Sequence, residues 1–463
     1  MSECIKGWQF TSPNYLANSQ SQLNMLERGQ QAKEAARCDE IIQFKPNGPD
    51  SFYSDKQGAR AKPNERLKKV FGIDNAFTNP ELGFKKDFTT KTEFLMKSAA
   101  GSTDENKDGD WSGLRIQAMT FFSEYMARKS DTAVDLAELT QYIVLKQSLC
   151  YLFKNAHAAL ESQDLFTDIT FIGHRINELW IKSKIAETLP EDQQPAWEKE
   201  TDLHKALRRV TKSPVPGGFD SDSNSDVDPE VPEANPMNFL LPAYETMWRV
   251  VLRCFLEINH RGANGGPAWT LSLVQYLDDL KDATAINPTK AFHKPTNNPT
   301  ETDIDKIRPV EIVKEALRLY PPTRRVHRVF DGQAQSADIE TCQRFELLGG
   351  NDPLVYRPER WQSICLEARQ NFYEQQGNYK TIKDALRSAE AKEGHMPFAH
   401  YCAADHSSTR EFASKMIALL VAVLCHGLRD EWELEDAEIL PPVGTPLESD
   451  RSAYEKLMLK RKT

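Results

Sequence analysis

The sequence lacks a long hydrophobic run. Its longest apolar stretch, MIALLVAVLC (Met416–Cys425), is too short to cross a bilayer and lies deep in the chain. The first residues, MSECIKGWQF, carry no apolar leader segment. We therefore expect a soluble, cytoplasmic protein that makes no contact with a membrane.

Positive charge is outweighed by negative charge, because the chain has 58 Lys and Arg residues and 68 Asp and Glu residues. For the 463 residues of the chain, the formal net charge is −10 and the pI is near 5.6. Nucleic acids and anionic lipids are bound by clustered lysine and arginine, so this surface argues against both as partners. The eight cysteines are scattered and form no CxxC pair, which indicates reduced thiols instead of a disulfide framework.

Strand signals are few and short, RRVHRVF being the clearest, whereas helical periodicity is frequent. We expect a mainly α protein with a small β component. Residues 1–65 are polar and broken by proline and glycine, which favours an irregular segment, and residues 66–463 then form a single domain. Within it, residues 213–236 are rich in Pro, Gly, Ser and Asp, which predicts a flexible acidic loop.

A buried acid is predicted within the segment Met237–Gly262. This segment is apolar on nearly every side until Arg249, which is typical of a central helix. Glu245 interrupts it, and a buried glutamate is costly unless it has a partner. We therefore interpret Glu245 as a residue that lines a pocket.

Three segments in this order resemble the cytochrome P-450 family of haem-thiolate monooxygenases. In LLPAYETMW, Glu245–Thr246 match the acid–alcohol pair that handles protons during dioxygen activation. In EALRLYPPTRRVHR, Glu315 and Arg318 match the ExxR pair. In DPLVYRPERW, Arg360 matches the arginine that joins the ExxR pair in a structural charge network. The resemblance implies a cytochrome P-450-like fold.

The resemblance also implies where a haem would be held. Arg328 stands where the family often places an arginine on a haem propionate. WSGLR (Trp111–Arg115) is similar to the WxxxR segment that meets the propionates. Phe398 matches the phenylalanine of the ligand loop, and Phe412–Ala413 match the start of the helix after it.

The thiolate ligand is missing from its expected place. The family has cysteine seven residues after the phenylalanine, but here that position is Asp405. Glycine, which lets the loop approach the porphyrin, is absent from Pro397 to Ser414. Cys402 lies only four residues after Phe398, so it could ligate iron only if the loop were displaced. We therefore expect a fold without haem, with haem on Cys402 as the alternative.

A zinc site is a further possibility in this segment, because four residues with metal-binding side chains fall close together. The spacing matches no known zinc pattern, so we expect no metal. These residues are His395, His400, Cys402 and His406.

Without haem, the fold implies an enzyme that works by shape and hydrogen bonding. We expect a pericyclase, of Diels–Alder type, that cyclises an apolar terpenoid or polyene in fungal secondary metabolism and needs no reductase. The alternatives are a monooxygenase that uses Cys402 and an inactive binding protein. A hydrogen-bond donor would activate a substrate carbonyl, and Arg115 or Arg328 would meet a carboxylate. The candidate donors are Tyr244, Glu245, Thr246, Arg325 and His327.

Loss of the thiolate can be tested by the visible spectrum. We expect protein expressed with a haem precursor to be colourless, because no cysteine stands at the ligand position. The measurement is the absorbance of the purified protein, reduced and treated with carbon monoxide. A thiolate-type Soret band that disappears in the Cys402→Ser variant would contradict the expectation and favour the displaced ligand.

Overall fold

The computed structural model describes residues 13–100, 109–129, 133–153, 160–161, 164–211, 227–262, 265–282, 286–296, 306–374, 379–399, 402 and 409–462. Most of the predicted acidic loop, up to residue 226, lies outside these residues. The α-helices are α1 (Pro13–Ile42), α2 (Lys56–Ala61), α3 (Glu65–Phe71), α4 (Leu82–Ala99), α5 (Ser112–Lys129), α6 (Leu136–Leu152), α8 (Phe166–Ile185), α9 (Thr201–Thr211), α10 (Met237–Leu256), α11 (Gly266–Asp279), α12 (Pro288–Phe292), α13 (Pro309–Leu319), α14 (Ile339–Gln343), α15 (Glu346–Gly349), α16 (Leu366–Glu374), α17 (Tyr379–Lys392) and α18 (Phe412–Leu428).

Five short strands form two small antiparallel sheets. In the first, β5 (Met458–Arg461) lies between β1 (Ala133–Asp135) and β4 (Trp432–Leu434). The second is a hairpin of β2 (Arg325–Phe330) and β3 (Gln333–Asp338). Its turn, Asp331–Gly332, has positive φ at both residues, which is the backbone conformation that an Asp-Gly hairpin turn adopts. The mainly α architecture with a small β component is confirmed.

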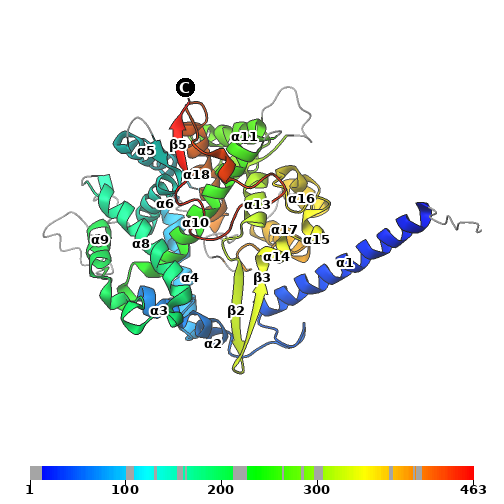
Figure 1. Cartoon of the computed structure of the whole chain (residues 1–463), viewed down its shortest axis with the longest axis horizontal. Coiled ribbons are helices and arrows are strands. Elements are labelled where there is room, and N and C mark those ends of the chain that lie inside the picture. The colour runs from blue at the N-terminus through cyan, green and yellow to red at the C-terminus, as the bar shows by residue number, and fades with distance from the viewer. Residues whose placement is uncertain are drawn as a thin grey trace, which may run out of the picture.

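Four helices form the centre of the protein, where α10 lies between α6 and α18, and α5 packs on both α6 and α18 (Figure 1). Each of α6, α10 and α18 is buried along almost its whole length. Because their apolar residues extend around the helix, they are covered on all sides instead of forming one stripe. After Leu256, α10 continues as one π-helical turn, Glu257–Arg261.

A proline shapes the N-terminal half of α10. Pro242 has no N–H, so the carbonyl of Asn238 one turn earlier loses its helical donor. That carbonyl instead accepts a hydrogen bond from Asn75 Nδ2 at 3.0 Å. The carbonyl that Pro242 leaves without a helical donor thereby links α10 to the loop after α3.

The N-terminal segment differs from the sequence-based expectation. Residues 13–42 form the long helix α1 instead of an irregular chain, because they are rich in strong helix formers. Figure 1 shows α1 leaving the body of the protein, with its C-terminal end beside β3. Its last turns bury Ala35, Cys38, Ile41 and Ile42, so a few residues near its end fix the helix to the body.

A buried charge network fixes α13 to the chain that follows it. The carboxylate of Glu315 accepts from Arg318 Nε at 2.9 Å and Nη2 at 2.8 Å, and from Arg360 Nε at 2.8 Å. The indole N–H of Trp361 and the backbone N–H of Arg357 also donate to it, at 3.0 and 2.9 Å. The side chains of Glu315 and Arg318 are fully buried.

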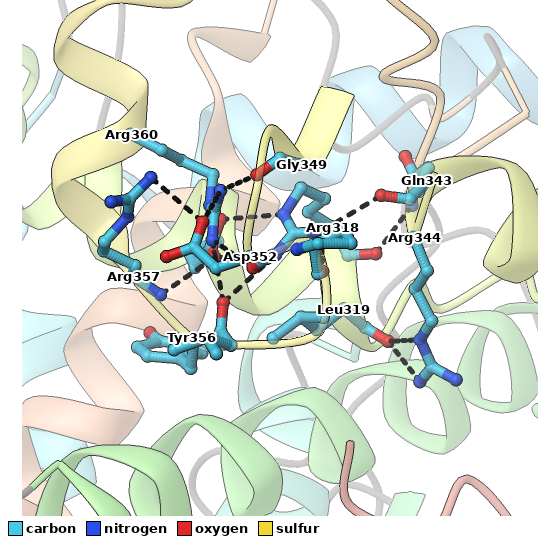
Figure 2. A network of polar contacts seen from close by, with 12 residues as sticks. Arg318, Leu319, Gln343, Arg344, Gly349, Asp352, Tyr356, Arg357 and Arg360 are labelled. Atoms are coloured by element: carbon cyan, nitrogen blue, oxygen red, sulfur yellow. Dashed lines mark hydrogen bonds and ion pairs between the residues drawn. The ribbon is translucent and has the colours of Figure 1, made fainter. Parts of the chain in front are cut away.

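The two arginines extend this network to backbone carbonyls. Arg318 donates to Pro353 at 2.7 Å and to Gln343 at 3.1 Å, and Arg360 donates to Val355 at 2.9 Å. Figure 2 shows Arg318 and Arg360 next to the turn that contains Gly349 and Asp352. Apart from α15 and the 3₁₀ turn Pro358–Gln362, residues 344–361 have no regular structure, so these bonds hold a segment with few backbone hydrogen bonds of its own.

The network keeps Glu315 ionised. Burial alone would raise the pKa of this carboxyl, but Arg318 and Arg360 outweigh burial, and the pKa lies below its usual value. A lowered pKa in the folded state means that the stabilising contribution is present above the carboxyl's unfolded pKa. It is lost as the pH falls through the folded pKa.

Within the described residues, every helix is too short or too polar to span a bilayer.

Removing the charge of Glu315 should be strongly destabilising. We expect Glu315→Gln to lower the free energy of unfolding by about 3–5 kcal/mol, because it leaves the buried Arg318 guanidinium without a counter-charge and Arg360 with only the partly exposed Asp352. Urea unfolding followed by circular dichroism measures this change. Asp278→Asn is the control, since Asp278 forms an exposed i,i+3 pair with Lys281 and should cost less than about 1 kcal/mol. Equal effects of both substitutions would contradict a central role for the network.

Candidate functional site

The predicted buried acid is paired with two arginines. Glu245 contacts the Arg451 guanidinium, which comes from the C-terminal segment, and Arg249 Nε lies 3.8 Å from the carboxylate. The indole N–H of Trp248 donates to Glu245 Oε2 at 3.2 Å. All four side chains are buried. The cost of burying Glu245 is therefore offset within the protein.

The neighbouring alcohol is also engaged. Thr246 Oγ1 donates to the carbonyl of Pro242 at 2.7 Å, a bond within the same helix. Neither member of the acid–alcohol pair matched by sequence therefore has a side chain free of protein partners.

Arg451 fills the space beside this pair. Its guanidinium lies 4.1 Å from the ring centroid of Trp180 on α8, which is a cation–π distance. Asn177, one turn earlier on α8, donates to the carbonyl of Arg451 at 3.3 Å. The C-terminal segment thus bridges α8 and α10 at the level of Glu245.

Tyr244 has an unused hydrogen-bonding group. It is fully buried, and its hydroxyl has no hydrogen-bond partner among the described residues. A methyl group placed on Gly173 of α8 would lie 3.0 Å from Tyr244 Oη and 3.8 Å from Gln141 Oε1. Gln141 Oε1 is likewise buried without a partner in the described part of the chain. A donor and an acceptor therefore face a glycine where α6, α8 and α10 meet.

Burial decides the protonation state of Tyr244. Removal from water raises the pKa of the phenol well above its ordinary value, and the charge of Arg451 offsets this only in part. The hydroxyl is therefore protonated at any physiological pH and can donate a hydrogen bond.

The hairpin places its candidate residues on two faces. Arg325 and His327 are exposed, and Arg325 pairs with Asp338 across the hairpin at 3.0 Å. Neither residue is brought together with Tyr244 and Glu245. Arg328 points inward, over the ring of Phe44 at 4.6 Å, and its Nε has no partner among the described residues. Burial, reinforced by Arg60, lowers the pKa of Arg328 to about 9.

Arg115 has a backbone partner. Its Nε donates to the carbonyl of Leu277 at 2.8 Å, near the end of α11, so it caps that helix. Trp111 is buried against Phe412, with ring centroids 5.2 Å apart. The WxxxR segment thus joins α5 to α11 and α18.

The segment that would hold an iron ligand is described only in part. Residues 400–401 and 403–408, which include His400, Asp405 and His406, lie outside the described residues. Cys402 lies close enough to Tyr151 of α6 to contribute to that phenol's pKa, which burial chiefly raises, to about 12.

A small charged cavity lies next to Phe398. Its volume is about 50 Å³, far below the roughly 300–1,000 Å³ of typical ligand pockets. Two buried carboxylates line it: Glu390 pairs with Lys314, and Glu411 with Lys383. The cavity has the size of a few water molecules and does not accommodate a polyene.

His395 borders the same cavity. Its ring lies against Trp361, and its Nδ1 is 4.0 Å from Glu390. Burial lowers the pKa of His395 to about 3, so the ring is neutral. No group of three or more potential metal ligands occurs within the described residues.

The side chains that the resemblance assigns to a haem do not fit one as a set. Arg115 is bonded to a backbone carbonyl, and Glu245 is held in an ion pair with Arg451. Of the assigned groups, Arg328 and Trp111 each combine burial with a nitrogen, Nε and Nε1 respectively, that has no partner in the described structure. The set therefore offers two unpartnered nitrogens, of which only that of Arg328 carries a positive charge, and no free proton relay.

Sequence reasoning missed the partners that define this region. Arg451 pairs with Glu245 of α10 and stacks on Trp180 of α8, and neither Arg451 nor Trp180 lies in a motif. The buried position of Glu245 did indicate that a cationic side chain should lie beside it. No feature of the sequence, however, identified Arg451 as that side chain.

Solved structures of cytochromes P450 are similar to the structure of this chain. The haem domain of cytochrome P450DA matches 93% of this chain and 86% of its own, with 13% sequence identity and a TM-score of 0.50. A variant of cytochrome P450 OleT, in complex with arachidonic acid, matches 88% of this chain and 84% of its own, with 13% identity and a TM-score of 0.47. No protein-family model matches the chain, and no curated protein does. The chain has a cytochrome P-450-like fold.

The pairing of Glu245 with Arg451 can be measured by a double-mutant cycle. We expect Arg451→Met to lower the free energy of unfolding by about 3 kcal/mol, because it leaves the buried Glu245 carboxylate with only Arg249, 3.8 Å away, as a counter-charge. Glu245→Gln should restore about 1–3 kcal/mol in that background. The exposed pair Lys460–Glu433 is the control and should couple by less than about 1 kcal/mol. Additive effects of the two buried substitutions would show that the residues do not interact.

Proposed function

We propose that this chain is a haem-independent enzyme of cytochrome P-450-like fold that catalyses a non-redox intramolecular cyclisation. The reaction is pericyclic, of Diels–Alder type, and the substrate is a terpenoid or polyene intermediate of fungal secondary metabolism. The observation that carries the proposal is the buried, protonated hydroxyl of Tyr244, which has no acceptor among the described residues.

The ion pairs and hydrogen bonds that hold Glu245 and Thr246 support a reaction without dioxygen. A proton relay needs side chains that can exchange partners during the reaction. Glu245 is held by Arg451 and Arg249, and Thr246 is bonded to Pro242. Moving a proton through Glu245 would break a buried ion pair, which costs several kcal/mol.

A pericyclic reaction asks less of the protein. Diene and dienophile must be held in a near-attack geometry, which contributes up to about 7–11 kcal/mol in favourable cases. One donor to a carbonyl on the dienophile stabilises the charge that develops there. Tyr244 supplies such a donor, and its hydroxyl lies close to Gly173 of α8, where an added methyl group would be only 3.0 Å from it.

Arg328 supports a substrate with an acidic group. A buried guanidinium with an unused nitrogen is a good partner for a carboxylate. Arg328 and Tyr244 therefore have different roles in the proposal: the first anchors an anion, and the second polarises a carbonyl.

A second candidate is a binding protein without catalytic activity. The filling of the space beside α10 by Arg451 and Trp180 favours it. In that case the protein would bind an apolar ligand but leave its covalent structure unchanged.

An assay without NADPH separates these functions. We expect purified protein to convert a linear polyene with an activated dienophile into a cyclic product of unchanged mass. Tyr244→Phe should lower the rate about 10²–10³-fold, the usual effect of losing one donor to a developing charge. Because the hydroxyl has no protein partner, its removal should leave the free energy of unfolding equal or up to about 1 kcal/mol higher.

Tyr276→Phe is the matched control. Tyr276 is equally buried but bonds to the carbonyl of Lys415, so the substitution should leave the rate unchanged. Binding of the polyene without turnover would support the binding protein. A product heavier by one oxygen atom, formed only with NADPH and a reductase, would refute the proposed cyclisation.

A further inference from the structure

We propose that Cys38 and Cys342 form a redox-modification site, in which a hydroperoxide converts the two thiols into a disulfide that fastens α1 to α14. This inference does not depend on the proposed function.

The two sulfur atoms are brought together from opposite ends of the sequence. Cys342 Sγ donates to Cys38 Sγ at 3.0 Å, across a separation of 304 residues. A disulfide needs about 2.05 Å between the sulfurs, so closing the bond requires a movement of about 1 Å. Both residues are buried, and both are free thiols.

Their surroundings form a separate small core. The pair lies among Ile41 and Ile42 of α1, Ile339 of α14 and Met396. Cys38 Sγ also lies 3.9 Å from the carbonyl of Asp338, at the end of β3. The site therefore lies at the junction where the end of α1 meets the hairpin and α14.

The contact makes the two thiols unequal. The S–H of Cys342 donates to Cys38, which lowers the pKa of Cys38 although burial opposes it. The same bond, together with burial, raises the pKa of Cys342. Because the thiolate is the reactive form, Cys38 is the nucleophile and Cys342 is the resolving thiol.

The chemistry balances with a hydroperoxide as the oxidant. The Cys38 thiolate attacks one oxygen of hydrogen peroxide, the O–O bond breaks, and hydroxide leaves, which gives a sulfenic acid. Cys342 then attacks the Cys38 sulfur, and the S–O bond breaks with release of water after proton transfer. Two thiols lose two hydrogen atoms in total, and the peroxide is reduced to two waters.

The other buried thiols lack this arrangement. Cys254 and Cys425 are fully buried, and burial raises the pKa of each thiol, that of Cys425 to about 12. Their hydrogen-bond partners are Tyr356 and Asn259, not a second sulfur. They serve as internal controls in the same molecule.

Peptide mapping tests the proposal on the wild-type chain. Fully reduced protein is treated with hydrogen peroxide, alkylated in denaturant and digested. We expect one disulfide-linked peptide pair that contains Cys38 and Cys342, with Cys254 and Cys425 alkylated. Oxidation of Cys38 should be at least about tenfold faster than that of Cys254. Absence of the linked pair, or equal oxidation of all buried cysteines, would overturn the proposal.

Two variants separate the roles of the sulfurs. Cys342→Ser should stop at the sulfenic acid, which dimedone traps on Cys38. Cys38→Ser should leave Cys342 unmodified. Thermal melting supplies an independent readout: peroxide should raise the Tm of the wild type by several degrees, reversibly with dithiothreitol, and neither variant should respond. Oxidation of Cys342 in Cys38→Ser at the wild-type rate would refute the assigned order.

Discussion

The fold depends on one fully buried carboxylate, that of Glu315. Glu315 accepts five hydrogen bonds, from Arg318, Arg357, Arg360 and Trp361, and these residues lie in a helix and in a segment with little regular structure. Its two guanidinium partners bond in turn to carbonyls between residues 343 and 355. A segment with little helix or sheet structure of its own is thereby fixed against α13. Apolar contacts alone would not fix it in this way, because they carry no direction.

A second buried carboxylate shows how the same requirement limits the chemistry. Glu245 lies at the centre of α10 and could be retained there only with a cation beside it. Arg451 and Arg249 supply that charge, and Arg451 also stacks on Trp180. The pairing stabilises the acid and also takes it out of use as a proton carrier. Tyr244 is neutral and is not held in such a pair, which is why the proposed cyclisation assigns the donor role to it.

Sequence patterns predicted the elements whose signals are local. The apolar segment Met237–Gly262, which forms α10, and the short strand signal RRVHRVF, which forms β2, each depend on residues that are close together in the chain. Helix α1 was missed because its sequence is polar on almost every side, so it carries no stripe to reveal it, and its helix-forming composition was the better guide. The partners of Glu245 were missed for another reason. Pairing across the fold depends on topology, which the spacing of Arg451 along the chain does not encode.

Two of the residues in the proposed function cost stability and form no part of the framework. The Tyr244 hydroxyl is desolvated without a partner among the described residues, which costs about 1–3 kcal/mol. Arg328 Nε is also buried without a partner among the described residues. A phenylalanine and a leucine would fill these positions without that cost. Framework residues such as Glu315 can be explained by stability alone, whereas Tyr244 and Arg328 cannot. A polar group that destabilises the free protein, but gains a hydrogen-bond partner when a ligand binds, is what we expect to find in a binding site.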